Sequence, residues 1–396
     1  MSATVRNTPA QTSALIAGSV TLSVALGTRA AFGLFLVPLS AMGIPLADVA
    51  LAIAIHNLSW GAAQPLAGAW ADRAGAARVQ ALGALLYAAG FALPALVPAS
   101  WSVMLGIGLL TGVGMAFLGW GVSLAGVARA FPAARRSSAT GLASAGGSVG
   151  QMVLLPVAAA AIGYGGGALG LLVMAGVLLI ALPLGGPLDR AALERPAPRK
   201  AMAAVRLAVV DRNFVLVSLG FFTCGFQLAF LATHLPGYLS LCGMPASTGA
   251  WALMLVGGAN IVGSWACGRL GQIVPPQYVL AALYTVRAAA ILAFWLSPKD
   301  VLSTALFAIV MGLLWLGTVP LTNAVIASRF GVRDIGALFG VCFISHQIGG
   351  FLGAWMGGLV FGWTGTYDAA FLATAASGLV AAAFNLPIRS PRVVAA

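Results

Sequence analysis

Long apolar runs fill almost the whole chain, and short polar or basic stretches separate them. About 20 apolar residues cross the hydrocarbon core of a bilayer as one helix, and runs of this length recur twelve times. The predicted spans cover residues 14–40, 48–71, 78–97, 101–127, 138–162, 167–187, 213–239, 248–270, 277–297, 301–327, 335–360 and 367–387. We therefore expect an all-α membrane protein with twelve transmembrane helices, embedded in the lipid bilayer.

The composition supports this interpretation. Of the 396 residues, 61% are hydrophobic and 7% are charged, whereas a soluble globular protein carries roughly 25% charged residues. The sequence contains no nucleotide-binding loop, no catalytic triad and no metal-ligand spacing of its cysteines, so we expect neither a cofactor nor enzyme activity. The cysteines are Cys224, Cys242, Cys267 and Cys342.

Basic residues gather on one side of the predicted helices. All but three of the 20 Lys and Arg residues fall in the termini, the central segment and one set of loops; the exceptions are Lys299, Arg29 and Arg287. Because cytoplasmic loops are enriched in Lys and Arg, this pattern predicts that both termini are cytoplasmic, in a multi-pass protein of the inner (plasma) membrane. It also explains the net charge of +12 without a nucleic-acid partner.

The chain divides into two similar halves. We expect six-helix bundles at residues 1–187 and 213–396, joined by a polar cytoplasmic loop at 188–212. Four positions of the first span line up with positions of the seventh at an offset of 198: Gly27, Arg29, Phe32 and Pro38 align with Gly225, Gln227, Phe230 and Pro236. Parallel repeats of this kind place a cavity between the halves, and rocking of the halves exposes it to each side in turn.

The loop after the second span has a recognisable pattern. The segment from Gly68 to Arg78 reads G-A-W-A-D-R-A-G-A-A-R, and it resembles the G-x-x-x-D-R-x-G-x-x-R signature of the major facilitator superfamily. The resemblance implies that fold for the whole chain, with two parallel six-helix repeats. It also implies a gating role for this loop, in which Asp72 pairs with a neighbouring Arg in one access state only. The implied gating residues are Gly68, Asp72, Arg73 and Arg78; a merely solvated turn is the alternative.

Several further segments are similar to bacterial members of the monocarboxylate and oxalate–formate branch of this superfamily. They are Arg29–Leu36, Trp60–Pro65, His234–Pro236 and His346–Gly353. The sequence departs from that branch where relatives carry cations, because the eighth span offers only Asn260 and the eleventh offers His346 and Gln347. The antiporter motif of the fifth span is not evident, so antiport is not assumed.

The ionisable residues inside the predicted spans suggest what passes through. Arg29 and Arg287 lie near the middle of the first and ninth spans, where a charge is costly. The eight acids all lie at span ends or in loops: Asp48, Asp72, Asp189, Glu194, Asp211, Asp300, Asp334 and Asp368. Buried cations without fixed counter-charges favour an anionic substrate. The alternatives are that Arg29 clamps backbone carbonyls and that Arg287 packs or snorkels.

Uncharged polar residues within the spans complete the candidate site. We predict substrate contacts from Arg29, Gln227, His346, Gln347, Asn57, His234, Asn260 and Arg287. A histidine can take up a proton near neutral pH, so proton coupling would use one of the three histidines or the substrate itself. For each residue the alternative is an ordinary interhelical hydrogen bond.

These observations lead to three hypotheses. The first is a secondary active transporter of a small organic anion, a monocarboxylate, that works by alternating access as a monomeric functional unit, with proton coupling left open. The second is an efflux transporter for a hydrophobic or neutral compound, in which Arg29 is structural. The third is a membrane sensor or scaffold without flux, which would need a soluble signalling domain.

Overall fold

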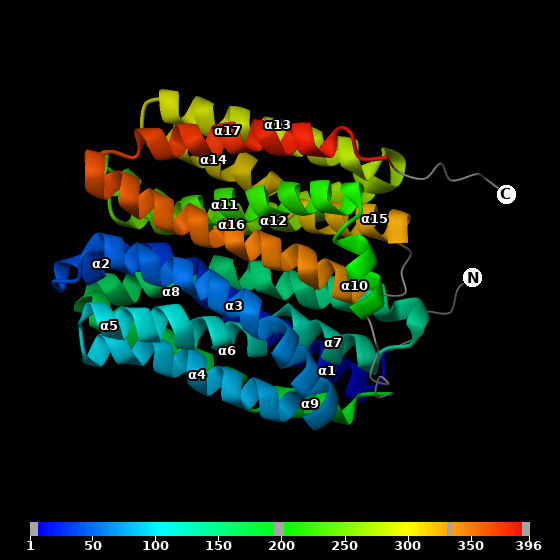
Figure 1. Cartoon of the computed structure of the whole chain (residues 1–396). Helices are drawn as coiled ribbons and strands as arrows, with labels where there is room; N and C mark the ends of the chain where they lie inside the picture. Colours follow the sequence, from blue (N-terminus) through cyan, green and yellow to red (C-terminus); the bar gives the residue numbers. More distant parts are fainter. Residues whose placement is uncertain (1–6, 194–201, 331–334, 390–396) are drawn as a thin grey trace.

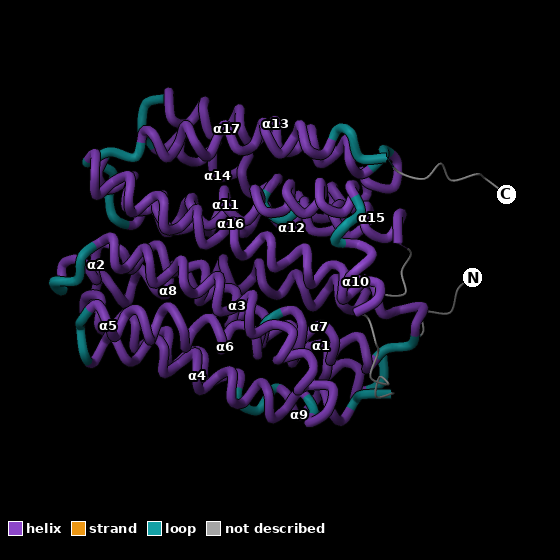
Figure 2. Tube along the Cα trace, viewed as in Figure 1, coloured by secondary structure: helices purple, strands orange, loops and turns teal. Residues whose placement is uncertain are grey.

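The computed structural model describes residues 7–193, 202–330 and 335–389, and all regular structure within them is helical (Figures 1 and 2). The first half contains the following elements: α1 (Pro9–Ala30), the 3-10 turn η1 (Ala31–Phe35), α2 (Leu36–Ala41), α3 (Leu46–Ala74), α4 (Ala76–Leu96), α5 (Ser100–Val103), the π-helical turn η2 (Met104–Leu110), α6 (Thr111–Leu118), α7 (Trp120–Ala130), α8 (Ala133–Leu178), η3 (Leu179–Ala181) and α9 (Gly185–Arg190).

The short helix α10 (Met202–Ala208) precedes the second half. That half contains α11 (Arg212–Leu241), α12 (Ser247–Ile273), α13 (Pro276–Leu296), α14 (Val301–Leu314), α15 (Thr318–Phe330), α16 (Ile335–Thr364) and α17 (Asp368–Asn385). Local sequence explains several of the helix starts. Thr8 forms a capping box with Gln11 before α1, and Asp211 and Asp300 cap α11 and α14 through their side chains.

Among the described residues, eleven helices are long and apolar enough to cross a membrane. The longest of them, residues 139–190, covers both the fifth and the sixth predicted spans. Its backbone leaves the helical conformation at Gly165 and Gly166, where Gly166 has φ +73°, a value that favours glycine. A Cβ on Gly170 would lie 2.6 Å from Ile162 Cγ1, so the segments before and after Gly165 and Gly166 lie against each other. The chain therefore reverses at Gly165 and Gly166, with the fifth predicted span before them and the sixth after them.

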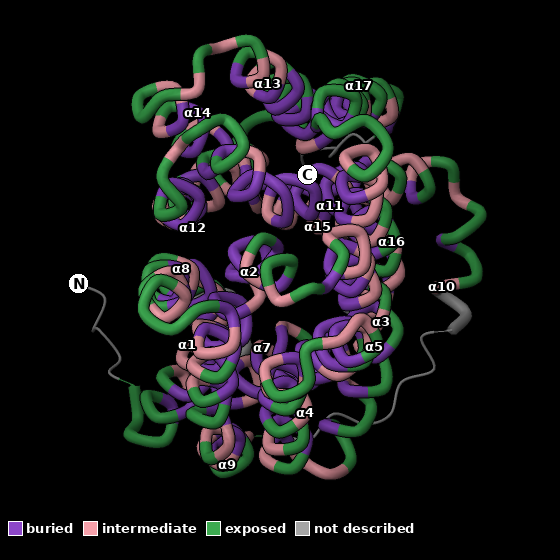
Figure 3. Tube along the Cα trace, turned by 90° about the vertical axis from the view of Figure 1, so that its left-hand side faces the viewer, coloured by how far each residue is buried: buried purple, intermediate pink, exposed green. Residues whose placement is uncertain are grey.

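The helices form two groups that lie side by side. In Figure 1, α1 to α9 occupy the lower half and α11 to α17 the upper half. Helices α3 and α8 of the first group pack against α16 and α12 of the second, and Figure 3 shows the same division in a view along the helices. We call the end at which α1 starts and α17 ends the basic end, since Arg73, Arg129 and Arg329 also lie there (Figure 1).

Two of the spans are broken at matching places. The helix of the fourth predicted span is interrupted at Gly119, between α6 and α7, and that of the tenth is interrupted over residues 315–317, between α14 and α15. Gly119 and Gly317 stand 198 positions apart, which is the offset that relates the two halves in the sequence. Such breaks free backbone groups inside the bundle, and these groups need partners.

Candidate functional site

A chain of hydrogen bonds crosses the junction between the two halves. Arg29 Nη2 donates to Asn57 Oδ1 at 3.0 Å, and Gln347 Nε2 donates to the backbone oxygen of Asn57 at 3.1 Å. Gln347 Oε1 lies 3.0 Å from His346 Nδ1. The structure therefore brings together four of the predicted site residues, from α1, α3 and α16.

Two glycines permit this close approach. A Cβ on Gly61 would lie 3.0 Å from Gln347 Cβ, and one on Gly350 would lie 3.1 Å from Asn57 Cγ. Both distances are tighter than ordinary contacts, so α3 and α16 can approach this closely because these positions carry no side chain. Asn57 and Gln347 are consequently buried.

Aromatic side chains surround the guanidinium group. The Cζ atom of Arg29 lies 5.1 Å from the centroid of the Trp60 ring, a distance typical of a cation–π contact. Trp60 lies 5.1 Å from Phe343 and 6.1 Å from Trp120, and Phe343 stacks on His346 at 5.7 Å. The site thus combines one cation with apolar walls contributed by both halves.

Two buried donors at this site have no hydrogen-bond acceptor among the residues that the structure describes. They are Nε of Arg29 and Nε1 of Trp120. Within the described part of the chain, no acid forms an ion pair with Arg29. Buried N–H groups are ordinarily paired, and an unpaired one costs about 1–3 kcal/mol. An oxyanion between the two halves would satisfy groups that the protein leaves open.

The two halves part toward the basic end. Four glycines lie near that end: Gly68, Gly141, Gly268 and Gly340. Each shares a helix face with a residue that lies two or three turns farther from the basic end and contacts the other half. These residues are Gly61, Ser148, Gly257 and Gln347, at separations of seven, seven, eleven and seven residues, respectively. Residues seven or eleven apart share a helix face. Among the described residues, a Cβ would meet nothing within 4 Å at any of the four, so the described parts of the junction are open at the basic end.

At the opposite end the same junction is closed. A Cβ on Gly33 would clash with the backbone oxygen of Ala232, and one on Gly358 would lie 2.5 Å from Ala50 Cβ. Both pairs join α1–α9 to α11–α17. The structure therefore shows the two halves in contact at this end, whereas they lie apart at the four glycines of the basic end.

The predicted gating residues lie at the basic end. Asp72 accepts a hydrogen bond from Arg129 at 2.6 Å, and 48% of its side chain is exposed. Arg73 and Arg78 are exposed, and Gly68 lies on the open face described above. The structure thus supplies an arginine partner for Asp72 from α7, within the same half.

A second acid at this end was not singled out by the sequence. Asp189 in α9 accepts from the backbone N–H groups of Ala76 and Ala77 at 2.6 and 2.9 Å. It therefore caps the first turn of α4, for which Gly75 supplies no side chain. A Cβ on Gly75 would also lie 2.6 Å from the Asp189 carboxylate. The signal in the sequence is weak, because the capping residue lies far along the chain from the helix it caps.

Arg287 occupies a different environment from Arg29. It is fully buried, and its Nη2 donates to the backbone oxygens of Leu314 and Trp315. Its Nη1 lies 3.5 Å from Cys224 Sγ. The two carbonyls stand where α14 ends, so the guanidinium satisfies groups freed by the helix break and opposes the negative end of the helix dipole.

Asn260 supports the same break from α12. Its Oδ1 accepts from the backbone N–H of Leu316 at 2.9 Å and from the Ser264 hydroxyl at 3.0 Å. Its Nδ2 donates to Ser148 Oγ at 3.0 Å across the junction. Its side chain therefore joins α12 to the helix break and, across the junction, to α8.

The structure places the remaining candidates apart from the Arg29 chain. Gln227 points toward α17 and donates to the backbone oxygen of Thr374 at 3.0 Å. His234 contacts Ala354 O at 2.7 Å and the Tyr367 hydroxyl at 3.3 Å. These two residues, although predicted to contact the substrate, lie in contacts internal to the second half.

His56 lies in the first half, one residue from Asn57. Its Nδ1 lies 2.7 Å from the hydroxyl of Thr111, which follows the π-helical turn η2. Its Nε2 is buried without a partner in the described part of the chain, and its ring packs edge-on against Phe32 at 4.8 Å. His56 thus lies within the first half, on α3, and faces the π-helical turn.

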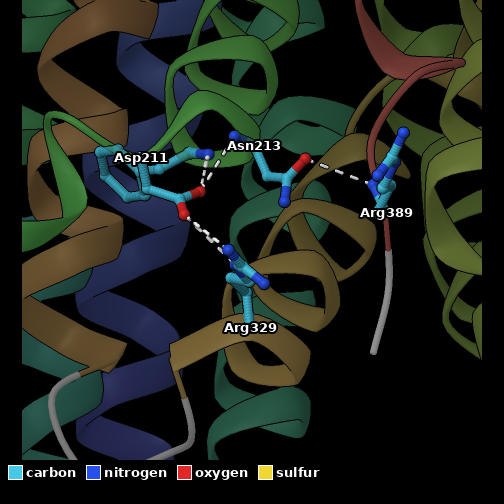
Figure 4. Close-up of polar contacts among 5 residues, drawn as sticks. Asp211, Asn213, Arg329 and Arg389 are labelled. Atoms are coloured by element: carbon cyan, nitrogen blue, oxygen red, sulfur yellow. Dashed lines mark hydrogen bonds and ion pairs between the residues drawn. The ribbon is translucent and has the colours of Figure 1, made fainter. Parts of the chain in front are cut away.

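A second ion pair at the basic end joins α15 to the start of α11 (Figure 4). Arg329 Nη2 lies 2.9 Å from Asp211 Oδ2, while Asp211 Oδ1 accepts from the backbone of Asn213 and Phe214. Desolvation opposes ionisation of this carboxyl group, but the bond from Arg329 and the two backbone bonds outweigh it and hold the pKa of Asp211 below its usual range. Asn213 in turn accepts from the backbone of Arg389 at 3.3 Å.

Comparisons with known proteins found a matching family and several similar proteins. The family model described as Major Facilitator Superfamily matches residues 17–354. The chain is 25% identical to the uncharacterized MFS-type transporter YcxA of Bacillus subtilis over 86% of this chain and 85% of that protein. It is 27% identical to monocarboxylate transporter 13 of Bos taurus over 89% and 83% of the two chains. It is 26% identical to the protein of the same name from Rattus norvegicus over 79% and 73%.

Proposed function

The chain belongs to the major facilitator superfamily, and on that premise we propose that it is a secondary transporter of a small organic anion of the monocarboxylate class. The observation that carries the proposal is the environment of Arg29. This cation lies at the junction of the two halves with an amide as its hydrogen-bond partner, an unpaired Nε and no acid bound to it in the described residues. An anion that binds and leaves would supply the missing charge.

The proposed binding mode uses the two open donors. The carboxylate accepts from Arg29 Nε and Trp120 Nε1, and the apolar part of the substrate lies against Trp60 and Phe343. A single negative charge matches a single guanidinium, whereas a dicarboxylate would bring a second charge that meets no cation here. Two relatives, both named monocarboxylate transporter 13, support the same substrate class.

The proposed transport cycle is alternating access. We take the basic end as cytoplasmic, in a twelve-span protein of the inner membrane whose six-helix halves rock as single units. In the present state the halves touch at Gly33 and are apart at Gly68. In the opposite state they are apart at Gly33 and touch at Gly68. The Asp72–Arg129 pair, which is formed in the present state, is broken as the basic end closes.

The test is uptake into proteoliposomes that contain the purified protein. The panel consists of labelled monocarboxylates, dicarboxylates and uncharged amide analogues, and the variants are R29Q and the matched control R269Q. Arg269 is an exposed cation at the basic end. Loss of a charge-assisted hydrogen bond of about 1.5–3 kcal/mol lowers monocarboxylate uptake by about 10- to 100-fold in R29Q, while R269Q transports like the wild type.

Two results would contradict the proposal. One is monocarboxylate uptake by R29Q at the wild-type rate. The other is a wild-type protein that moves only the uncharged analogues, which would instead support the alternative, efflux of a hydrophobic or neutral compound. Absence of flux for every compound in the panel would favour a non-transporting sensor.

A further inference from the structure

A hollow lies at the basic end of the second half, where α11 and α13 start and α17 ends. Its volume is about 590 Å³, which is within the range of small-molecule sites. It is lined by Arg212 of α11, Gln277 and Tyr278 of α13, and Leu386 and Arg389 at and after the end of α17. The described residues that line it include two arginines and no acid, so its charge suits an anion.

Both guanidinium groups are available to a ligand. Arg212 and Arg389 are exposed, and in the described part of the chain neither forms an ion pair. The carboxylate of Asp211, which precedes Arg212, bonds instead to Arg329 and to two backbone N–H groups (Figure 4). A phosphate group in the hollow would therefore meet two cations without displacing an internal partner, and arginine binds phosphate oxygens with two parallel N–H groups.

The fold holds the two arginines together. Asn213 in the first turn of α11 accepts from the backbone N–H of Arg389 at 3.3 Å (Figure 4), and α17 packs against both α11 and α13. Helix α13 begins at Pro276 without a side-chain cap, and the residues of its first turn line the same hollow. The positive end of its dipole therefore adds to the attraction for an anion.

The hollow lies at the membrane boundary. Its residues stand at the ends of α11, α13 and α17, which are all long and apolar enough to cross a membrane. Leu386 lines the hollow, and Leu379 and Leu372 lie seven and fourteen residues before it, on the same face of α17. All three are exposed. An exposed apolar strip therefore leads from the hollow along α17 into the bilayer.

We propose that this hollow binds the headgroup of an anionic phospholipid, with the phosphate between Arg212 and Arg389 and an acyl chain along the apolar strip of α17. Basic pockets between membrane helices suit anionic headgroups, and the strip supplies what an acyl chain requires. A soluble phosphate compound would use the arginines alone. The inference depends on the membrane-spanning fold and not on what the protein transports. The bound headgroup joins the start of α11 to the end of α17 and so stabilises the second half.

The experiment measures lipid binding through thermal stability. Dioctanoyl phosphatidylglycerol is titrated into the purified protein in detergent, and Tm is followed by tryptophan fluorescence. Parallel titrations use dioctanoyl phosphatidylcholine, which has no net charge, and glycerol 3-phosphate, which has the phosphate without acyl chains. The variants are R212Q, R389Q and the matched control R269Q, which removes an exposed cation of the basic end outside the hollow.

Because a ligand that binds the folded state raises its stability, phosphatidylglycerol should raise the Tm of the wild type. The concentration that gives half of the maximal shift should be about 5-fold higher in R212Q and in R389Q, from the contribution of one arginine to the binding of an anionic lipid. R269Q should titrate like the wild type. Phosphatidylcholine and glycerol 3-phosphate should give smaller shifts.

Three results would overturn the inference. The first is the same titration curve for R212Q, R389Q and R269Q, which would show that the lipid responds only to the overall charge. The second is an equal shift with glycerol 3-phosphate, which would identify a soluble phosphate ligand instead. The third is an equal shift with phosphatidylcholine. Arg389 follows the last helix, so R389Q keeps the test decisive if R212Q does not fold.

Discussion

Gln347 of α16 donates its side-chain amide to the backbone oxygen of Asn57 in α3, at 3.1 Å. The bond joins the two halves at the depth where the closed part of the junction gives way to the open part. Gly61 lies against Gln347 on one side of this boundary, and Gly68, on the same face of α3, meets nothing within 4 Å. A side chain at the boundary is well placed to respond to both the substrate and the rocking of the halves.

Replacement of Gln347 by alanine should weaken substrate binding. An interhelical hydrogen bond contributes about 0.6–2 kcal/mol, so we expect the KM for the transported anion to rise by about 3- to 30-fold in Q347A. The control is N323A, since Asn323 donates only to Val319 O within its own helix. Equal KM values for the two variants would contradict this assignment.

The glycines of the junction should control which end is open. Valine at Gly33 clashes with Ala232 O, whereas valine at Gly68 has free space in the present state. We expect G33V to favour the state closed at the basic end and G68V to retain the present one. Spin labels at positions 78 and 269, one in each half at the basic end, report this as a shorter distance in G33V. A longer or unchanged distance in G33V would show that the contact does not restrict rocking.

The two buried arginines should differ in what their loss affects. R287M leaves the carbonyls of Leu314 and Trp315 without their donor, at a cost of about 1–3 kcal/mol for each unsatisfied group. We therefore expect R287M to have a lowered Tm in detergent. The Tm of R29M should change little, whereas its anion uptake should be abolished. The reverse pattern would assign the structural role to Arg29.

The Asp72–Arg129 pair should affect the transport rate more than the stability. Because Asp72 is half exposed, the pair contributes only about 0.2–1 kcal/mol to stability. D72N is expected to slow uptake several-fold with a nearly unchanged Tm, and the exchanged pair D72R/R129D should recover part of the rate. Failure of the exchanged pair to exceed both single variants would argue against gating by this ion pair.

The Asp211–Arg329 pair predicts a specific dependence of stability on pH. The pKa of Asp211 is lowered in the folded protein, so its stabilising effect is fully present above the unfolded value of about 4 and is lost as the pH falls through the lowered folded value. The Tm of the wild type should exceed that of D211N by a constant amount above about pH 4, and the two curves should converge at lower pH. Asparagine still caps α11, so the difference isolates the charge. In an R329Q background the difference should shrink.

The amino-acid sequence by itself determined the class of the protein, the helical spans and the short list of polar residues within them. These are local properties, because apolar length and the position of a charge within a run can be counted along the chain. The resemblance to the family came from the residue spacing of the segment from Gly68 to Arg78, and the four residues of the Arg29 chain were among the polar residues within the spans. The reversal at Gly165 and Gly166 agrees with the boundary that the hydropathy pattern predicts between the fifth and sixth spans.

Only the tertiary structure decided what each polar residue does. Arg29 and Arg287 are equivalent in the sequence, since each is a lone cation near the middle of an apolar span. They differ because α14 breaks beside Arg287 and offers it two carbonyls, whereas α3 offers Arg29 the amide oxygen of Asn57. In the same way, the sequence indicates only that Cys224 and Trp120 are ordinary buried residues. Packing places the Cys224 thiol beside Arg287 and leaves the Trp120 indole N–H without an acceptor among the described residues. Which face of a helix meets which partner depends on segments remote in the chain, and a hydropathy pattern does not contain that information.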